Sequence, residues 1–349
     1  MTRMPDQERL VVGGVDTHRD FHVAAALDSQ GRVLATATFP ARREGYRQLG
    51  DWLSSFGRVE ELGIEGTGAY GAGLCRFLSQ AGIATVEVIR PNRQHRRRHG
   101  KSDATDAIAA ARAVLSGEAR GEPRGGTGRV ESIRMLKLAR RGAMRAKIAA
   151  GNQIHALIVT APEQIRSQLR DLPLAKIVAT VARYRPGPLG EDHTQAAKQA
   201  LKSLAARYRG LEAEIEGLDQ ELQPLVTAAN PTLTELCGVG TQTAADLLIA
   251  AGSNPHRIGS DSSFAALCGS SPVDASSGQQ QRHRLNRGGD RQANAALYRI
   301  VIVRLRYHQP SRYYMERRLK EGLTKKEIVR CLKRYVAREV YQILNQPVP

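Results

Sequence analysis

The pattern of apolar and polar positions predicts a sheet at the start of the chain. Residues 11–27 read VVGGVDTHRDFHVAAAL, two β-branched and apolar runs around a polar turn, and residues 32–39 alternate as a third strand. Short strands at 61–66 and 84–89 then alternate with helices expected at about 43–56, 70–81 and 102–116, the last capped by Ser102. Strand–helix alternation begins only after this three-strand meander, so we expect a mixed sheet.

The second half of the chain has mainly helical periodicity. Residues 130–159 are helical in period with a basic polar face, and apolar residues recur at three- and four-residue steps from Leu201 to Leu225. This pattern predicts a long helical hairpin or coiled coil that ends at Asn230–Pro231. Five glycines in residues 117–129 predict a linker or mobile loop, and four prolines leave residues 160–200 without a prediction.

The charge balance indicates the class of partner. The 349 residues carry 52 Lys and Arg against 34 Asp and Glu, a net charge of +18, with a pI of about 10.2. A polyanion such as nucleic acid is the expected partner, because it would neutralise the repulsion in a compact fold. A membrane-surface role would need bulky apolar residues opposite the basic ones, and only 5% of the residues are aromatic.

Cysteine usage and hydropathy indicate the cellular compartment in which we expect the protein. The cysteines stand apart, without a CxxC pair, and predict neither a zinc site nor a disulfide framework: Cys75, Cys237, Cys268 and Cys331. The N-terminal MTRMPDQERL lacks an apolar stretch, and no run of about 18 apolar residues occurs. We therefore expect a soluble cytoplasmic protein with no membrane partner.

Four carboxylates fall at matching elements of one predicted fold. Asp16 ends the apolar run of the first strand, and Glu65 ends the fourth. A three-strand meander followed by strand–helix units suggests a ribonuclease-H-like sheet, in which strands one and four are neighbours. Asp103 and Asp106 are three positions apart and share one face of a helix. Such a cluster is a candidate site for two Mg²⁺ ions that hold a phosphodiester, although each acid alone is also typical of a turn or a helix start.

A strongly basic run precedes the aspartates, in the stretch RPNRQHRRRHGKSDATDA. Its cations are candidate phosphate contacts for that site, although such a run alone is typical of a solvated loop: Arg90, Arg93, Arg96, Arg97, Arg98 and Lys101.

Two further motifs lie in the second half. The stretch CGVGTQTA, residues 237–244, is compatible with a hairpin whose backbone N–H groups approach DNA phosphates, or with a helix-capping turn. The stretch ASSGQQQRHRLNRGGDRQAN places two serines in a polar loop that is either ordinary or nucleophilic. Serine attack on DNA conserves the phosphodiester's energy, so strands can be rejoined without ATP. The cations that follow could hold the attacked phosphate: Arg282, His283, Arg284, Arg287 and Arg291.

Taken together, these motifs resemble the DEDD transposases of the bacterial insertion-sequence family IS110 over nearly the whole chain. The carriers are GVDTHRDFHVAA, GIEGTGAYGAGL, RPNRQHRRRHGKSDATDAIAAARA, LCGVGTQTA and SSGQQQRHRLNRGGDRQANAALYR. The resemblance implies that the catalytic tetrad is Asp16, Glu65, Asp103 and Asp106, binding Mg²⁺ or Mn²⁺, and that the nucleophile is Ser277, with Ser276 as runner-up.

The resemblance also implies a domain order and partners. We expect an α/β, ribonuclease-H-like (RuvC-like) mixed-sheet domain at 10–118, a linker at 119–129, a helical coiled-coil insertion at 130–230 and a mainly α-helical C-terminal domain with the serine at 231–346. Expected partners are double-stranded donor and target DNA, a non-coding bridge RNA that pairs with both, and further copies of the chain in a dimer or tetramer. The acids of one protomer would then meet the serine of another, at the bacterial nucleoid.

The expected function is therefore a metal-dependent transposase with a transient phosphoserine–DNA link. Two other functions remain open from the sequence. In a junction-resolving nuclease, water would attack and the serine would be idle, whereas in a nucleic-acid-binding scaffold the acids would only cap helices and form ion pairs.

Overall fold

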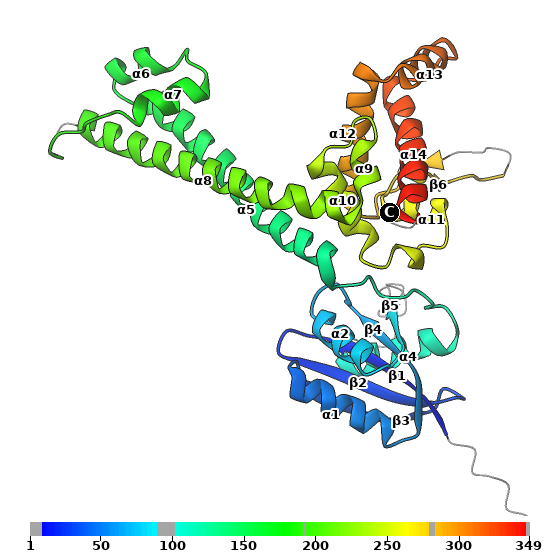
Figure 1. Ribbon diagram of the computed structural model, residues 1–349. Coiled ribbons are helices and arrows are strands. Elements are labelled where there is room, and N and C mark those ends of the chain that lie inside the picture. Colours follow the sequence, from blue (N-terminus) through cyan, green and yellow to red (C-terminus); the bar gives the residue numbers. More distant parts are fainter. Residues whose placement is uncertain (1–8, 89–101, 191–192, 279–282, 347–349) are drawn as a thin grey trace, which may run out of the picture. The chain divides into compact units, whose positions relative to one another are not determined.

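The computed structural model (Figure 1) describes residues 9–88, 102–190, 193–278 and 283–346. Its contacts divide the chain into two units, each with a hydrophobic core of its own. The first unit comprises residues 1–128 with 251–263, and the second comprises 129–250 with 264–349.

A five-stranded mixed sheet forms the centre of the first unit. The strands are β1 (Leu10–Thr17), β2 (Phe21–Asp28), β3 (Val33–Pro40), β4 (Arg58–Glu65) and β5 (Thr85–Val88). Their order is β3-β2-β1-β4-β5, with antiparallel pairing among the first three and parallel pairing of β4 with both β1 and β5. The mixed sheet is thus confirmed, strands one and four are neighbours, and the arrangement fits a ribonuclease-H-like domain.

Helices cover both faces of this sheet. One face packs against α1 (Arg43–Ser54) and α2 (Ala72–Gln80), through a core that includes Val15 and Ile64. The other face, which includes Val12, packs against α4 (Asp103–Leu115) through the alanines of that helix. Side chains alternate between the faces along each strand, so the residue after Val15 or Ile64 faces α4.

The segment after α4 is fixed to the first unit by specific contacts. Gly121 forms a β-bridge with Glu87 of β5, and Asn254 contacts three residues of the segment. The amide of Asn254 donates to Glu122 Oε1 and to the Pro123 carbonyl, and its oxygen accepts from the Gly125 N–H. Part of the stretch expected as a mobile linker is therefore held against this unit by a residue about 130 positions later in the chain.

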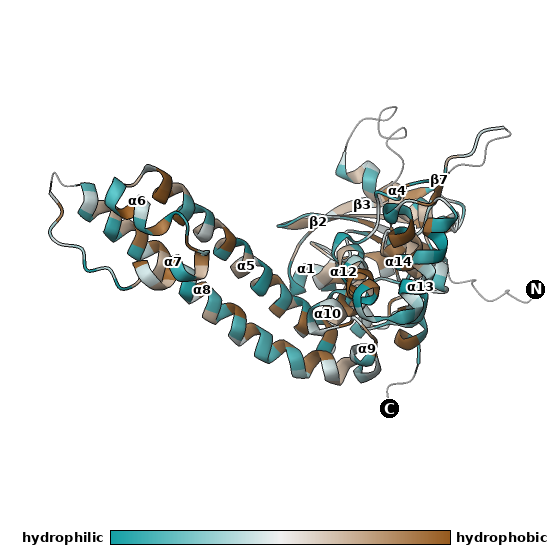
Figure 2. Ribbon diagram, turned by 90° about the horizontal axis from the view of Figure 1, so that it is seen from above, coloured by the Kyte–Doolittle hydropathy of each residue, from teal (hydrophilic) through white to brown (hydrophobic). Residues whose placement is uncertain are grey.

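Two long helices dominate the first part of the second unit. They are α5 (Gly128–Thr160) and α8 (His193–Ala229), joined through α6 (Glu163–Leu169) and α7 (Leu174–Val181). Ion pairs Arg140–Asp219 and Lys147–Glu212 show that α5 and α8 run antiparallel. Apolar and polar residues alternate along both helices (Figure 2), and the apolar ones form a core with α6 and α7.

The region that the sequence left without a prediction, 160–200, contains α6 and α7. Pro162 and Pro173 stand at the N-caps of these short helices. Proline cannot donate a backbone hydrogen bond and favours the first turn of a helix. These prolines therefore mark the starts of two short helices, and the spacing of apolar residues in the sequence did not reveal those helices.

The remaining elements are short up to residue 290 and helical afterwards. They are α9 (Pro231–Glu235), α10 (Thr241–Ala251), η1 (Pro255–Arg257), α11 (Asp261–Leu267), β6 (Val273–Asp274), β7 (His283–Arg284), α12 (Arg291–Tyr307), α13 (Gln309–Lys320) and α14 (Lys325–Leu344). Asn230 caps α9 by accepting from the Leu233 N–H. Among the described residues, no helix is long and apolar enough to span a membrane.

Candidate metal centre

Strand pairing places the first two acids side by side. Val15 of β1 pairs with Ile64 of the parallel strand β4, so the next residues, Asp16 and Glu65, are neighbours at the ends of their strands. Val15 and Ile64 both belong to the core on the α1–α2 side. Asp16 and Glu65 therefore project from the opposite face, toward α4.

Helix α4 supplies the other two acids in its first turn. Ser102 caps it, because the Ser102 hydroxyl accepts a hydrogen bond from the Thr105 N–H at 3.2 Å. Asp103 and Asp106 follow, and Asp106 is buried with 8% exposure. The cap thus fixes where the helix begins and hence where both carboxylates lie.

Glycine allows α4 to lie directly on β1. A Cβ atom on Gly14 would stand 2.2 Å from the Ala107 carbonyl oxygen and 2.3 Å from the Ala111 nitrogen, both backbone atoms. Only glycine permits this approach without moving the helix. The short distance brings the first turn of α4 to the end of β1 that carries Asp16.

His18 joins the cluster, although the sequence had placed it only in a turn. Its Nε2 atom lies 3.2 Å from Asp16 Oδ2 and 3.4 Å from Asp103 Oδ2. One ligand atom from each of these three residues lies within 4.8 Å of the others, an arrangement that could hold a metal ion. The sequence signal for His18 was its position two residues after a strand-end aspartate.

The other three acids all affect the pKa of the Asp16 carboxyl. Burial raises the pKa of the Asp16 carboxyl above its ordinary value; the His18 imidazole opposes this rise, while Glu65, Asp106 and Asp103 add to it. The ionised forms therefore repel one another in a partly desolvated space. A divalent cation would relieve this repulsion, and carboxylate oxygens are the ligands that Mg²⁺ and Mn²⁺ prefer.

The turn after β4 holds Glu65 in place through its backbone. The Thr17 hydroxyl donates to the Glu65 carbonyl at 2.8 Å, which ties the ends of β1 and β4 together. Gly66 follows with a φ of +74°, a conformation that favours glycine. The buried Thr67 then donates to Glu87 Oε1 at 2.6 Å, anchoring the turn to β5.

The expected serines lie in the second unit, whereas the acids lie in the first. Ser276 and Ser277 are both exposed in the loop after β6, and Gly278 follows with a φ of +56°. The Ser276 N–H donates to Asp274 Oδ1 at 2.9 Å, and the Ser276 hydroxyl donates to the same oxygen. The loop is therefore an Asx-type turn that displays two hydroxyls.

The basic residues predicted to contact phosphate divide into two groups. Seven lie outside the described residues: Arg90, Arg93, Arg96, Arg97, Arg98, Lys101 and Arg282. Of the others, Arg284, Arg287 and Arg291 are exposed in or just after the segment that follows β6, and His283 precedes Arg284 in β7. Arg284 also lines a pocket described below.

The glycine hairpin at residues 237–244 has a packing explanation. Gly238 has a φ of +85°, and a Cβ atom there would lie 2.9 Å from the Ile300 carbonyl oxygen of α12. The Thr243 hydroxyl donates to the Gly240 carbonyl and accepts from its N–H, which closes the turn before α10. Glycine is thus needed here for close packing, and phosphate binding by this turn stays a prediction.

Comparison with known families matches both halves of the chain. Residues 13–161 match a family model described as Transposase, of the DEDD type of IS110, and residues 230–316 match one described as Transposase IS116/IS110/IS902 family. No curated protein matches the sequence significantly. The first match contains all four acids, and the second contains both serines. A DEDD family implies divalent metal use, and a transposase acts on DNA. The chain belongs to the IS110 family of transposases and is a DNA transposase.

Proposed function

We propose that Asp16, Glu65, Asp103 and Asp106 bind Mg²⁺ or Mn²⁺ in a RuvC-like domain, and that Ser277 attacks DNA. The observation that carries this proposal is the convergence of the four acids on Asp16, with His18 bridging two of them. When bound, the cation supplies positive charge that stabilises the attacked phosphate. The four carboxylates orient that charge, and the cap at Ser102 keeps two of them in position.

The serine step balances without an external energy source. The Ser277 oxygen forms an ester bond to phosphorus as its proton passes to a base, and the bond from phosphorus to a deoxyribose oxygen breaks. That oxygen leaves as a hydroxyl after taking up a proton. A hydroxyl from the other strand then attacks the phosphoserine, which rejoins DNA and returns the serine.

Ser276 is a second candidate nucleophile. Its hydroxyl donates to the Asp274 carboxylate, a group that could accept the proton during attack. Ser277 has the support of the family resemblance, in which the serine next to glycine is the nucleophile. The two candidates differ by one position, so a site-resolved experiment must separate them.

Covalent trapping provides that experiment. The purified chain would be incubated with DNA that spans an end of its element, then denatured and resolved on a gel, and the digested adduct would be located by mass spectrometry. We expect a phosphate remnant on Ser277, loss of the adduct in Ser277→Ala and its retention in Ser276→Ala. The reverse pattern would assign the nucleophile to Ser276.

The alternatives predict different results. A junction-resolving nuclease would cut DNA without any adduct and would keep cutting after both serines are changed to alanine. A scaffold would bind nucleic acid but support no cleavage in the wild type, so Asp16→Asn would change nothing. Either pattern would contradict the proposed mechanism.

We further propose that a bridge RNA directs the chain and that protomers assemble as a dimer or tetramer with composite sites, acting at the nucleoid in the cytoplasm. The support is the family resemblance together with a high positive charge and no recognised base-reading module. The corresponding domains are the RuvC-like domain at 10–118, the linker at 119–129, the coiled coil at 130–230 and the serine-bearing domain at 231–346. Sequencing of nucleic acid that copurifies with the chain tests the RNA: a recurrent transcript from the element's flank is expected, and random cellular RNA would contradict it.

A further inference from the structure

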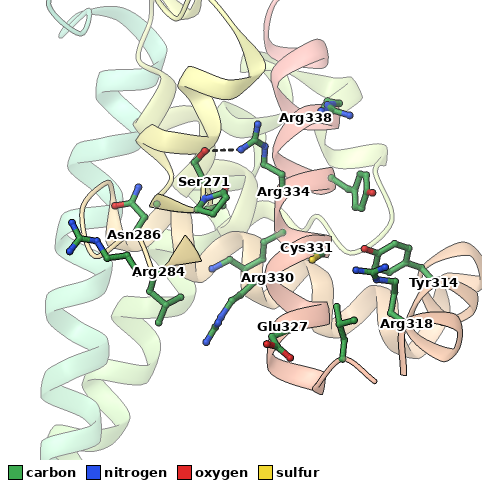
Figure 3. Close-up of a pocket in the computed structure, with 17 residues that line it drawn as sticks. Ser271, Arg284, Asn286, Tyr314, Arg318, Glu327, Arg330, Cys331, Arg334 and Arg338 are labelled. Atoms are coloured by element: carbon green, nitrogen blue, oxygen red, sulfur yellow. Dashed lines mark hydrogen bonds between the residues drawn. The ribbon is translucent and has the colours of Figure 1, made fainter. Parts of the chain in front are cut away.

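A basic pocket lies in the second unit, within residues 269–338 (Figure 3). Its volume is about 670 Å³, within the range of about 300–1,000 Å³ typical of sites for small organic ligands. One wall comes from β7 and the described residues that flank the β6–β7 pair, with Ser271, Arg284 and Asn286, and the opposite wall is α13 with Tyr314 and Arg318.

One face of α14 lies between these walls. Lining residues recur along it at three- and four-residue steps, which places them on a single face: Glu327, Arg330, Cys331, Arg334, Tyr335 and Arg338. Lys333 also lines the pocket. The helix begins with a capping box at Thr324, so the register of this face is fixed from its first turn.

The charge of the lining is strongly unbalanced. Of the described residues that line it, six are basic and one, Glu327, is acidic. One of the six, Arg318, pairs with Glu321 outside the lining. The Glu327 carboxylate is already engaged, because Glu327 Oε2 accepts from the Thr324 N–H at 2.9 Å and from the Thr324 hydroxyl at 2.7 Å. The pocket therefore favours an anionic ligand.

Hydrogen bonds across the pocket hold two of its cations in place. Arg334 Nη1 donates to the Ser271 hydroxyl at 2.7 Å, as Figure 3 shows. Lys333 Nζ donates to Asn294 Oδ1 at 2.7 Å, and the Asn294 amide in turn donates to the Cys268 and Gly269 carbonyls. These contacts connect α14 to residues 268–271, directly and through Asn294 of α12, so this side of the pocket is formed before a ligand binds.

The lining also offers flat apolar surface. Tyr335 is 48% exposed and Leu285 is 54% exposed. The Tyr335 and Tyr314 rings meet edge to face, with centroids 5.5 Å apart. A ligand that uses both features combines anionic charge with a flat ring, whereas an inorganic anion or a bare carboxylate would leave the tyrosines unused.

We propose that this pocket holds a nucleotide of single-stranded nucleic acid, with its phosphate among the cations of α14 and its base against Tyr335. Proteins bind single strands through such a combination of basic groove and aromatic platforms. A concave pocket suits an unstacked nucleotide, whereas duplex phosphates lie on a convex surface. This inference deepens the proposed function by giving the second unit a strand-binding site, and it depends on neither the metal centre nor the serine.

The empty pocket disfavours the charged form of Lys333. Burial, and next the positive charge of Arg330, lower the pKa of the Lys333 ammonium, while Cys268 opposes that decrease. A bound phosphate would favour the charged form of this lysine.

Binding measurements on the full chain test the proposal. Labelled oligouridylate, oligothymidylate and a duplex, each of about 20 nucleotides or base pairs to exceed one site size, would be titrated by fluorescence anisotropy with EDTA at several salt concentrations. We expect Tyr335→Ala to weaken single-strand binding by roughly 5- to 100-fold. Tyr335→Phe keeps the ring and is expected to bind like the wild type.

Arg330→Gln tests the phosphate contact. It is expected to reduce the salt slope of single-strand binding by about 0.7. Lys326→Gln removes the same charge from an exposed position of α14 outside the pocket and is the matched control. The salt slope of single-strand binding by Lys326→Gln is expected to match that of the wild type.

The probes distinguish the sources of the strand. If Tyr335→Ala loses more affinity for oligouridylate than for oligothymidylate, the pocket is assigned to RNA, and the reverse assigns it to DNA. Equal losses of affinity show that the pocket accepts either strand. Unchanged single-strand binding in both Tyr335→Ala and Arg330→Gln would overturn the proposal. The proposal would also be overturned if these variants lost as much affinity for the duplex as for the single strands. Because no metal or strand cleavage is involved, these outcomes are independent of the catalytic proposal.

Discussion

The His18 imidazole lies against the Asp16 carboxylate, with Nε2 3.2 Å from Oδ2. A protonated imidazole here partly offsets the charge of the acids, and a neutral one offers a nitrogen ligand. Only the neutral form could coordinate a metal ion at Asp16, because the protonated ring has no free nitrogen lone pair. In the proposed site, neutral His18 would therefore be a ligand or positioning group beside the four acids.

Replacement of His18 by alanine is expected to weaken Mn²⁺ binding by about 10- to 100-fold, the range for loss of a group that supports metal ligands. Isothermal titration or the paramagnetic signal of Mn²⁺ would measure this. His155→Ala, at an exposed position of α5, is the control and should bind like the wild type. Equal affinity in His18→Ala would remove this residue from the site.

Asp16→Asn is expected to raise the melting temperature of the metal-free protein at neutral pH. Burial places the folded-state pKa of Asp16 above 3.8. The stabilising contribution of this carboxyl is thus fully present below pH 3.8 and is lost as the pH rises through the folded-state pKa. Asparagine removes the penalty that the ionised form carries.

Thermal melts in EDTA and in Mg²⁺ check this prediction. The wild type should gain stability from Mg²⁺ by binding in the folded state, and Asp16→Asn should gain much less. If the variant melts below the wild type in EDTA at neutral pH, Asp16 does not carry the expected repulsion.

Gly14→Ala is expected to separate α4 from β1. The new Cβ atom would meet backbone atoms of Ala107 and Ala111 at 2.2 and 2.3 Å, so the helix must shift. Overpacking of this kind costs about 1–3 kcal/mol, and a displacement of about 1 Å at a reacting centre costs about 10²-fold in rate. Strand-exchange assays and Mn²⁺ titration should both decline.

Gly50→Ala is the matched control for that change. The added Cβ in α1 would meet only Ile83 Cδ1 at 4.0 Å, and alanine favours a helix over glycine. Activity should stay at the wild-type level. Full activity in Gly14→Ala would show that α4 need not lie so close for catalysis.

Asp246→Asn is expected to destabilise the second unit by about 3–5 kcal/mol. Asp246, at 2% side-chain exposure, pairs with Lys137 at 3.0 Å and with Arg299 at 3.0 Å, linking α5, α10 and α12. Burial lowers the pKa of Lys137, and the Asp246 charge opposes that decrease. Loss of the carboxylate leaves buried positive charge without its partner.

Urea unfolding would measure the Asp246 effect. Glu214→Gln, an exposed change on α8, should stay within about 0.5 kcal/mol of the wild type. A similarly small effect of Asp246→Asn would show that water or other groups compensate the cations.

The sheet and α4 could be predicted because local signals agree there. Alternating strands and the Ser102 cap mark these elements, and the strand-end acids follow from the neighbouring positions of β1 and β4. His18 and Asn254 could not be predicted in their roles, because each depends on contacts that only the folded chain creates. Gly238 shows the converse, since a glycine that suggested phosphate binding is required for packing on α12.

The central claim is that the acids cooperate to hold a divalent cation for DNA cleavage, and Glu65→Gln tests it most directly. The measurement is strand exchange with Mg²⁺ or Mn²⁺ on the element's own ends, beside Glu60→Gln, an exposed change on the same strand. We predict that Glu65→Gln loses about 10²–10³-fold in rate and most of its Mn²⁺ affinity, while Glu60→Gln keeps both. Wild-type exchange by Glu65→Gln, or exchange that proceeds in EDTA, would contradict the account.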